Sequence, residues 1–476
     1  MSATPFVTPH DVAPDLAIAA ILAHDGPIVL DLDETLYLRN STEDFIDSAR
    51  PGVLALLLMR LLDLVKPWRW TGGEATRDVW RVRFVTLFLP ATVRSWPDRV
   101  AGLAARFANV PLLTALKERG TPPIVATDGF QPIVAPLVSA LGLPDAQIVC
   151  ARMSTFDDRR CGKYRLACAA LGDDTVRSAL VLTDSMQDLP LLDACARPVR
   201  TVWPGARYQQ ALSGVYLPGQ YTTQIKRPGA RYIVRGILQE DFAFWVLSSI
   251  ALAAVPALHV LGLFFLLLSF WSIYEMGYID NDQIAARFET DPKLSDNFAQ
   301  AATTASRWAP WIWAIASGAI AIFLVRRPGH PAQIDFLKWA AVLVGTHFWF
   351  ALYNRFDKAT RVWLFSGLQF ARSAAFVAIV PILPIGAAAL GAHVLAKWVP
   401  YYVYRTGSKN WPDTSFHLMR LLFFVVLSLL LAIAQGAAIL WSWTALGLLG
   451  WNVFRARQEI RTAWKAAQRL DRTAGT

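Results

Sequence analysis

Asp31 and Asp33, two aspartates separated by one residue, are the side chains of this sequence best suited to chemistry. They lie at the end of the apolar run Pro27–Leu32, which is typical of a buried strand. Because alternate residues of an extended strand point the same way, both carboxylates can flank one phosphate. Asp31 can attack phosphorus and form an aspartyl phosphate, while Asp33 gives a proton to the leaving oxygen and then takes one from water. The pair predicts phosphoryl transfer.

Four polar residues further along the chain can complete such a site: Thr127, Lys163, Asp184 and Asp188. The Thr127 hydroxyl can hold a phosphate oxygen, and the Lys163 ammonium can neutralise its charge. Asp184 and Asp188 can complete an oxygen-ligand shell for Mg²⁺ beside Asp31. In the alternative interpretation, these carboxylates only solvate the ends of strands.

The elements that position these residues belong to an expected α/β domain over residues 1–215. Apolar runs at Pro27–Leu32, Pro123–Ala126 and Ala179–Thr183 each end in a polar cluster, and helical segments separate them. In a doubly wound, Rossmann-like sheet, ligands bind at the carboxyl ends of the strands. Thr127 and Asp184 follow the second and third runs directly, so the sequence predicts that they meet Asp31.

The order of these motifs resembles that of the haloacid dehalogenase-like phosphatase superfamily over roughly Val29 to Ala196. Thr127-Asp128-Gly129-Phe130, followed by Leu141-Gly142-Leu143, is similar to its phosphoserine-phosphatase branch. The resemblance implies a Mg²⁺-dependent phosphomonoesterase, although a folded relative without activity is an open alternative. It also implies a site made of catalytic Asp31, Asp33, Thr127 and Lys163, metal ligands Asp31, Asp184 and Asp188, and phosphate-binding Thr35 and Ser185.

An insertion of about residues 37–122 separates the first two motifs and is expected to form a helical cap, which selects substrates in the superfamily that the chain resembles. It contains the apolar stretch Val53–Leu62, followed by Trp68 and Trp70. Together with the residues that directly follow it, the apolar-dominated segment is about 13 residues long, which is too short to span a bilayer. Two interpretations stay open: an interfacial helix that reaches a lipid-borne phosphate, or a cap helix that packs on its own neighbours.

The rest of the chain is expected to be a membrane domain. Of 476 residues, 54% are hydrophobic and 17% are charged, and the formal net charge of +10 lies largely in the apolar half. This combination indicates cationic loops at an anionic membrane surface and argues against nucleic-acid binding. The four cysteines show no CxxC spacing, so they predict neither a zinc site nor a disulfide framework.

A linker at residues 216–241 is expected to join the α/β domain to an all-α domain at residues 242–453, followed by a basic cytosolic tail at residues 454–476. The expected loops and tail place fourteen Lys and Arg on one side and two on the other, which predicts that both termini are cytosolic. No secretory signal is visible at the N-terminus. Eight spans are expected, at Phe242–Ala257, Leu258–Tyr278, Trp308–Val325, Ile334–Tyr353, Val362–Val380, Leu383–Tyr402, Phe416–Ala434 and Ala437–Val453.

Carboxylates crowd the cytosolic end of the second expected span. Glu275, Asp282 and Glu289 are spaced by seven, so a continuing helix would place them along one face, where they could bind Mg²⁺ and a diphosphate. Pro292 must interrupt such a helix, which favours the alternative of a solvated acidic loop. Arg372, Lys397, His347 and His393 lie inside expected spans and receive no assigned role.

The pattern Asn281-Asp282-x-x-Ala285-x-x-x-Glu289 resembles the aspartate-rich motif of the UbiA prenyltransferases, multi-span enzymes that use Mg²⁺ and a diphosphate substrate. Ala285 and Glu289 depart from that motif. The resemblance also implies a second aspartate-rich motif after the sixth expected span, but Asp413 is the only aspartate there. Tyr353–Lys358 is similar to the basic diphosphate-side element of the family. The resemblance implies a diphosphate and Mg²⁺ site made of Asn281, Asp282, Glu289, Arg355 and Lys358.

Together these patterns predict a phosphomonoesterase coupled to a UbiA-like polyprenyl or phosphoribosyl transferase that acts on polyprenyl-linked phosphates in a bacterial inner membrane. The expected partners are a phosphorylated small molecule or polyprenyl phosphate lipid and the membrane, with Mg²⁺ as cofactor. The alternatives are a membrane-anchored phosphatase with a non-catalytic helical domain that binds lipid or a partner, and a membrane domain that works as a transporter. The sequence assigns no oligomeric state.

Overall fold

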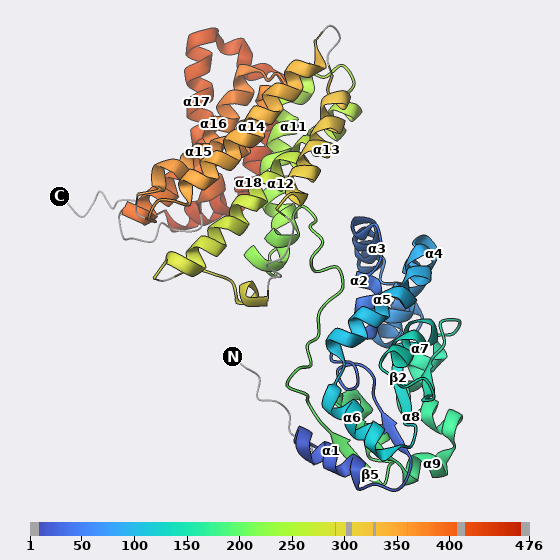
Figure 1. Cartoon of the computed structure of the whole chain (residues 1–476). Helices are drawn as coiled ribbons and strands as arrows, with labels where there is room; N and C mark the ends of the chain where they lie inside the picture. The colour runs from blue at the N-terminus through green and yellow to red at the C-terminus, as the bar shows by residue number, and fades with distance from the viewer. Residues whose placement is uncertain are drawn as a thin grey trace, which may run out of the picture. The chain divides into compact units, whose positions relative to one another are not determined.

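The computed structural model describes residues 9–290, 292–300, 307–326, 330–358, 360–406 and 415–467. The chain divides into two compact units, Met1–Val215 and Tyr216–Thr476, which are described separately as the first and second units. The first is an α/β unit and the second is helical (Figure 1).

The first unit is built on a five-stranded parallel sheet in the order β3-β2-β1-β4-β5. The two central strands, β1 and β4, consist almost entirely of Val, Ile and Leu and are fully buried, as expected for strands covered on both faces. The chain builds one half of the sheet as β1, β2 and β3 and then crosses to the other side of β1 for β4 and β5, so the direction of winding reverses between β1 and β4. Ligands of such sheets bind at this position. The strands are β1 (Ile28–Leu30), β2 (Ile124–Phe130), β3 (Gln147–Ala151), β4 (Leu180–Thr183) and β5 (Arg197–Arg200).

The helices between β1 and β2 do not all lie in the same part of the first unit. Helices α2 to α5 lie between β1 and β2 in sequence and gather at one end of the unit, from which α3 and α4 project (Figure 1). Helix α6 packs against α1 beside the sheet, although it also falls within the expected cap range. The helices are α1 (Pro14–Leu22), α2 (Ser41–Asp47), α3 (Gly52–Val65), α4 (Arg77–Phe88), α5 (Ala91–Phe107), α6 (Val110–Arg119), α7 (Gln131–Ala140), α8 (Asp157–Leu171), α9 (Asp173–Ser178) and α10 (Leu189–Leu192).

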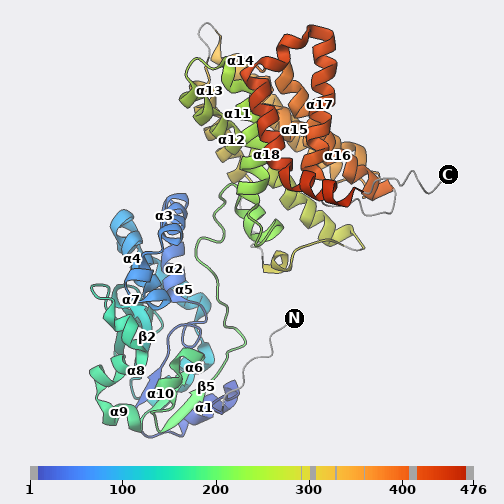
Figure 2. The same cartoon turned by 180° about the vertical axis from the view of Figure 1, so that it is seen from behind.

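The second unit is a bundle in which α16, α17 and α18 pack as successive neighbours (Figure 2). Its helices are α11 (Ala243–Ser249), α12 (Pro256–Phe288), α13 (Ala309–Leu324), α14 (Ala332–Tyr353), α15 (Val362–Ala374), α16 (Pro384–Thr406), α17 (Phe416–Gln435) and α18 (Trp443–Ala466). Its core is dominated by aromatic and aliphatic side chains such as Trp245, Phe270 and Phe376.

The helix boundaries differ from the expected spans at both ends of the bundle. Residues 216–241 belong to the second unit, and Ile233–Phe242 forms a π-helical segment that leads directly into α11. The expected linker therefore includes part of the first helical run. Helix α12 continues ten residues beyond Tyr278, the end of the expected second span, and α18 reaches into the basic tail.

Three helices among the described residues are long and apolar enough to cross a bilayer: α12, α14 and α17. Two shorter apolar stretches, Ala309–Leu324 and Val362–Ala378, occupy the positions of two further expected spans. The total of eight spans stays a prediction.

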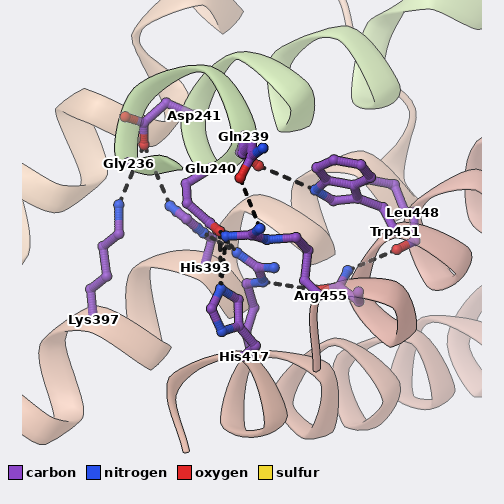
Figure 3. Close-up of polar contacts among 12 residues, drawn as sticks. Gly236, Gln239, Glu240, Asp241, His393, Lys397, His417, Leu448, Trp451 and Arg455 are labelled. Carbon is purple, nitrogen blue, oxygen red and sulfur yellow. Dashed lines mark hydrogen bonds and ion pairs between the residues drawn. The ribbon is translucent and has the colours of Figure 1, made fainter. Parts of the chain in front are cut away.

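An ionic network lies inside the second unit, around Glu240 and Asp241 (Figure 3). Both carboxylates belong to the π-helical segment Ile233–Phe242 and are buried. Asp241 accepts bonds from Arg372 of α15, at 2.6 Å, and from Lys397 of α16, at 3.3 Å. An unpaired charge in such a position would be costly, so these contacts tie the segment to both helices.

Glu240 binds a different set of helices. Its carboxylate accepts hydrogen bonds from Arg420 and, at 3.0 Å, from His417, both on α17. Arg455 of α18 donates to the same carboxylate at 2.9 Å through Nε. Adjacent residues of one short segment thus connect α15, α16, α17 and α18.

Candidate active site

Asp31 is the first residue beyond β1, and its backbone amide donates to the carbonyl of Leu182 in β4 at 2.9 Å. This bond holds Asp31 at the place where the winding of the sheet reverses. Asp33 follows in a tight turn, in which Glu34 has a positive φ of 56°. The Asp33 carboxylate accepts a hydrogen bond of 2.7 Å from the amide of Ser41 at the start of α2.

Thr127 lies where β2 becomes irregular, between Ala126 and Phe130. Its side chain is 1% exposed, and its hydroxyl oxygen accepts a hydrogen bond of 3.0 Å from the amide of Gly129. Gly129 approaches α7 closely, because a Cβ there would lie 2.6 Å from Cγ2 of Val134. The irregular strand end is thus fixed by a local hydrogen bond and by close packing.

Lys163 begins the second part of α8, directly after Gly162 interrupts the helix with a φ of 79°. Its ammonium lies 2.9 Å from Oδ1 of Asp31 and 2.7 Å from Oδ2 of Asp188. All three side chains are buried. Residues predicted from three distant parts of the sequence therefore meet in one site.

Asp184 and Asp188 approach from the end of β4. Asp184 accepts a hydrogen bond of 3.2 Å from the hydroxyl of Thr35, which is fully buried. The hydroxyl of Ser185 accepts from the amide of Gln187 and so caps the short turn Met186–Asp188. The proposed contacts of Thr35 and Ser185 with phosphate stay predictions.

Two residues that the sequence patterns did not single out also belong to this site. The Thr183 hydroxyl lies 2.6 Å from Oδ2 of Asp188 and 3.2 Å from Oδ2 of Asp31, so it bridges the two carboxylates. Ser41 holds Asp33 through its backbone amide. Thr183 is the last residue of an apolar strand. The only signal in the sequence that indicates a role in the site is its position directly before Asp184 and close to Asp188.

Burial shifts the proton affinities of the site. It raises the pKa of Asp33 to about 6, against the lowering effect of the hydrogen bonds from Ser41. Burial also raises the pKa of Asp31 well above its usual range, with Lys163 acting against it and Asp188, Asp184 and Asp33 adding to it. Asp33 can therefore hold a proton near neutral pH, as a general acid requires.

The site has the donor chemistry that Mg²⁺ requires. Burial raises the pKa of Asp184, and Asp184 in turn raises that of Asp31, so these carboxylates repel one another. A cation would relieve this repulsion. No group of three His, Cys, Asp or Glu side chains in the described residues is arranged to hold a metal alone. Mg²⁺ usually keeps several waters and takes one or two carboxylates together with substrate phosphate, so a Mg²⁺ site does not require three such side chains.

The predicted diphosphate residues of the second unit are only partly brought together. Glu289 accepts from Lys358 at 2.7 Å and from Arg361 at 3.3 Å, so the acidic and basic elements meet there. Asp282 accepts from Tyr221 at 2.9 Å, from Lys226 and, at 3.3 Å, from the neighbouring Asn281. Arg355 is exposed. Asp413 lies outside the described residues.

The expected acidic face forms only in part, because Glu275 and Asp282 lie seven residues apart on α12 but Glu289 does not belong to the helix. Helix α12 ends at Phe288, so Glu289 lies in extended backbone beyond it. Glu275 accepts hydrogen bonds from the amides of Gly219 and Thr222, at 2.8 and 2.6 Å. This carboxylate binds the segment that precedes the bundle and is saturated by it.

Comparison with known protein families gives one result for the first unit. The family model for haloacid dehalogenase-like hydrolase matches residues 28–193, a range that contains β1 to β4 and every site residue described above for the first unit. No curated protein and no solved structure matches the chain. This match supports, at a coarse level, a phosphatase-type hydrolase for residues 28–193.

Proposed function

We propose that the haloacid dehalogenase-like hydrolase domain at residues 28–193 removes phosphate from a phosphomonoester through a covalent aspartyl phosphate. The observation that carries this proposal is the contact of Lys163 with both Asp31 and Asp188, beside the protonatable carboxyl of Asp33. A nucleophile, a positive charge and a proton donor then face the same phosphate.

In the first step, a carboxylate oxygen of Asp31 forms a bond to phosphorus while the bond from phosphorus to the ester oxygen breaks. The electron pair leaves on that oxygen, which takes the proton of Asp33 and departs as the alcohol. In the second step, Asp33 takes a proton from water, whose oxygen bonds to phosphorus. The bond between Asp31 and phosphorus breaks, and inorganic phosphate leaves. Thr127 would hold a phosphoryl oxygen, and Lys163 would offset its charge.

We propose Mg²⁺ as the cofactor, held by Asp31 and Asp184 with Asp188 nearby. When bound, it would supply positive charge to the phosphoryl oxygens. Lys163 would orient the Asp31 carboxylate and favour its ionised form, because its ammonium lies 2.9 Å from Oδ1 and opposes the rise of the Asp31 pKa. Thr183 would hold Asp188 in place through its hydroxyl.

Substitution of Asp31 by Asn tests the proposal. With p-nitrophenyl phosphate and Mg²⁺, the wild-type chain should release phosphate and form a phosphoprotein that hydroxylamine cleaves. D31N should lose both. The matched control is Asp25→Asn, an exposed aspartate just before β1. Phosphate release by D31N at the wild-type rate would refute the assignment of the nucleophile.

For the second unit we propose a UbiA-like transferase that acts on polyprenyl-linked phosphates, so that its product is a substrate of the phosphatase. The contact between Glu289 and Lys358 supports this proposal, because it places an acidic and a basic residue at one position, as a site for a metal diphosphate requires. We place the chain in a bacterial inner membrane with both termini in the cytosol, on the basis of its basic loops and apolar helices.

The alternative is a membrane-anchored phosphatase with a non-catalytic bundle, favoured by the saturated Glu275. Lipid extracts from cells that make the wild-type chain or D31N separate the two. The coupled enzyme is supported if D31N cells accumulate a polyprenyl lipid that is heavier by one phosphate. This lipid should be absent when Asp282 is also replaced by Asn. Unchanged lipids, with intact hydrolysis of p-nitrophenyl phosphate by the wild type, support the anchored phosphatase. If the second unit is a transporter, it would move a lipid or an ion across the membrane, and neither D31N nor the replacement of Asp282 would change the lipid that is found.

A further inference from the structure

Helix α3 of the first unit buries one side and exposes a stripe of leucines on the other. The exposed fractions of Leu54, Leu57, Leu61 and Leu64 are 44%, 43%, 49% and 81%. Their spacing of three, four and three residues places them along one helical face. The opposite face, with Ala55, Leu56, Met59 and Leu62, is buried in the first unit. One side of this stretch therefore packs within the cap, and the other has no cover in the first unit.

Residues directly after α3 add an aromatic and a positive element to this stripe. Trp70 is 77% exposed, and Lys66 and Arg69 are exposed as well. We call the four leucines together with Lys66, Arg69 and Trp70 the α3 face. Tryptophan prefers the interface between headgroups and acyl chains, and each Lys or Arg near a membrane surface is attracted by anionic lipid.

The positive charges of Lys66 and Arg69 are not neutralised by an acidic residue of α3. Asp63 is the only acidic residue of α3, and its carboxylate pairs with Arg77 of α4 at 3.0 Å. The pair leaves Lys66 and Arg69 as the cations beside Leu64. An apolar stripe bordered by cations and a tryptophan complements an anionic lipid surface, because the leucines can enter the headgroup region while the cations pair with the lipid charges.

We propose that the α3 face docks on an anionic membrane surface, with its leucines and Trp70 at the level of the headgroups. At about 1.5 Å per residue, the 14 residues of α3 span about 21 Å, which is too short to cross the hydrocarbon core. The helix therefore lies in the interface. This inference rests on the proposed membrane location of the second unit. It deepens the proposed function, because a cap docked in this way brings the phosphatase to phosphate esters carried by lipids.

The test uses the full chain in nanodiscs that contain phosphatidylglycerol and doxyl-labelled phosphatidylcholine. A nitrobenzoxadiazole label is attached to Cys at position 64, 430 or 174, with the exposed Cys161 replaced by Ser. Leu430 lies on α17 and is 57% exposed, so its label reports the lipid. Asp174 is exposed on α9, and its label is the aqueous control. The label at Leu64→Cys should be quenched several-fold more than that at Asp174→Cys, and K66E combined with R69E should reduce the difference.

The remaining outcomes separate this inference from the proposed membrane location. Quenching at position 430 without quenching at position 64 would overturn the docking of α3 and leave the membrane location intact. Quenching at none of the three positions would overturn both. Equal quenching at positions 64 and 174 would also overturn the docking, because contact would then not be specific to the α3 face. If the label at position 64 were quenched equally with and without K66E and R69E, the two cations would not contribute to binding. The proposed preference for anionic lipid would then be wrong.

Discussion

The ammonium of Lys163 lies 2.9 Å from Oδ1 of Asp31, although 131 residues separate the two in sequence. Burial lowers the pKa of Lys163, but the neighbouring Asp31 and Asp188 more than offset this effect, so its pKa is raised overall. Lys163 therefore stays charged over the whole physiological range. The site contains a permanent positive charge in direct contact with the proposed nucleophile.

Replacement of Lys163 by Met should slow the formation of the phosphoenzyme by about 10²- to 10³-fold, the usual effect of losing one charge-stabilising donor. Arg165→Met is the matched control, because Arg165 is exposed on the same helix. Rapid-quench measurement of phosphoprotein formation from p-nitrophenyl phosphate gives the rate. A K163M rate within twofold of the R165M rate would contradict a role for the ammonium.

Binding of Mg²⁺ to the metal-free chain should release protons. The raised pKa values of Asp31, Asp33 and Asp184 mean that these groups hold protons at a pH where ordinary aspartates do not. A cation favours the ionised forms of its ligands Asp31 and Asp184, so the affinity for Mg²⁺ should rise with pH until both carboxylates are ionised. Calorimetry in buffers of different ionisation enthalpy counts the protons. The release should decrease in Asp184→Asn, and a pH-independent affinity would contradict the predicted ligands.

Gly129 should not tolerate a side chain. An Ala Cβ at this position would lie 2.6 Å from Cγ2 of Val134, so the loop that carries Thr127 must shift. We expect kcat/KM for p-nitrophenyl phosphate to fall by about tenfold, or about 1.4 kcal/mol, in Gly129→Ala. Adding Val134→Ala makes room for the new methyl group and should restore most of the loss. A double variant as slow as G129A would show that the contact with Val134 is not the cause.

The side chains that meet in the candidate site of the first unit were predictable because their signals are local. Each follows a short apolar run or a polar turn, and parallel strands bring such positions to one edge of the sheet. Thr183 was not predictable in the same way. Its hydroxyl reaches Asp31 only because Leu182 of β4 is in register with Leu30 of β1, a pairing between segments about 150 residues apart.

The ionic network of the second unit escaped sequence reasoning for a different reason. Arg372, Lys397 and His393 were recognised as charged or polar positions inside spans, but their partner Asp241 lies one residue before the first expected span. Charged residues at that position indicate the end of a span in a hydropathy pattern. The π-helical segment that carries Glu240 and Asp241 into the bundle has no comparable local signal.

Replacement of Asp241 by Asn should destabilise the second unit strongly. The Asp241 carboxylate contacts Arg372 and Lys397, and its loss leaves the buried Arg372 and the partly buried Lys397 without their anion. Breaking a buried pair in this way costs about 3–5 kcal/mol, because the remaining charge is desolvated and unpaired. For a unit of this size the cost corresponds to a fall in Tm of about 10 °C, measured on the full chain in detergent.

The matched control is Asp280→Asn, an aspartate of α12 that is only partly buried. Adding Lys397→Met to D241N removes one of the two orphaned cations and should recover part of the loss. If D241N and D280N melted at the same temperature, the network would not stabilise the bundle, and its buried charges would need another explanation.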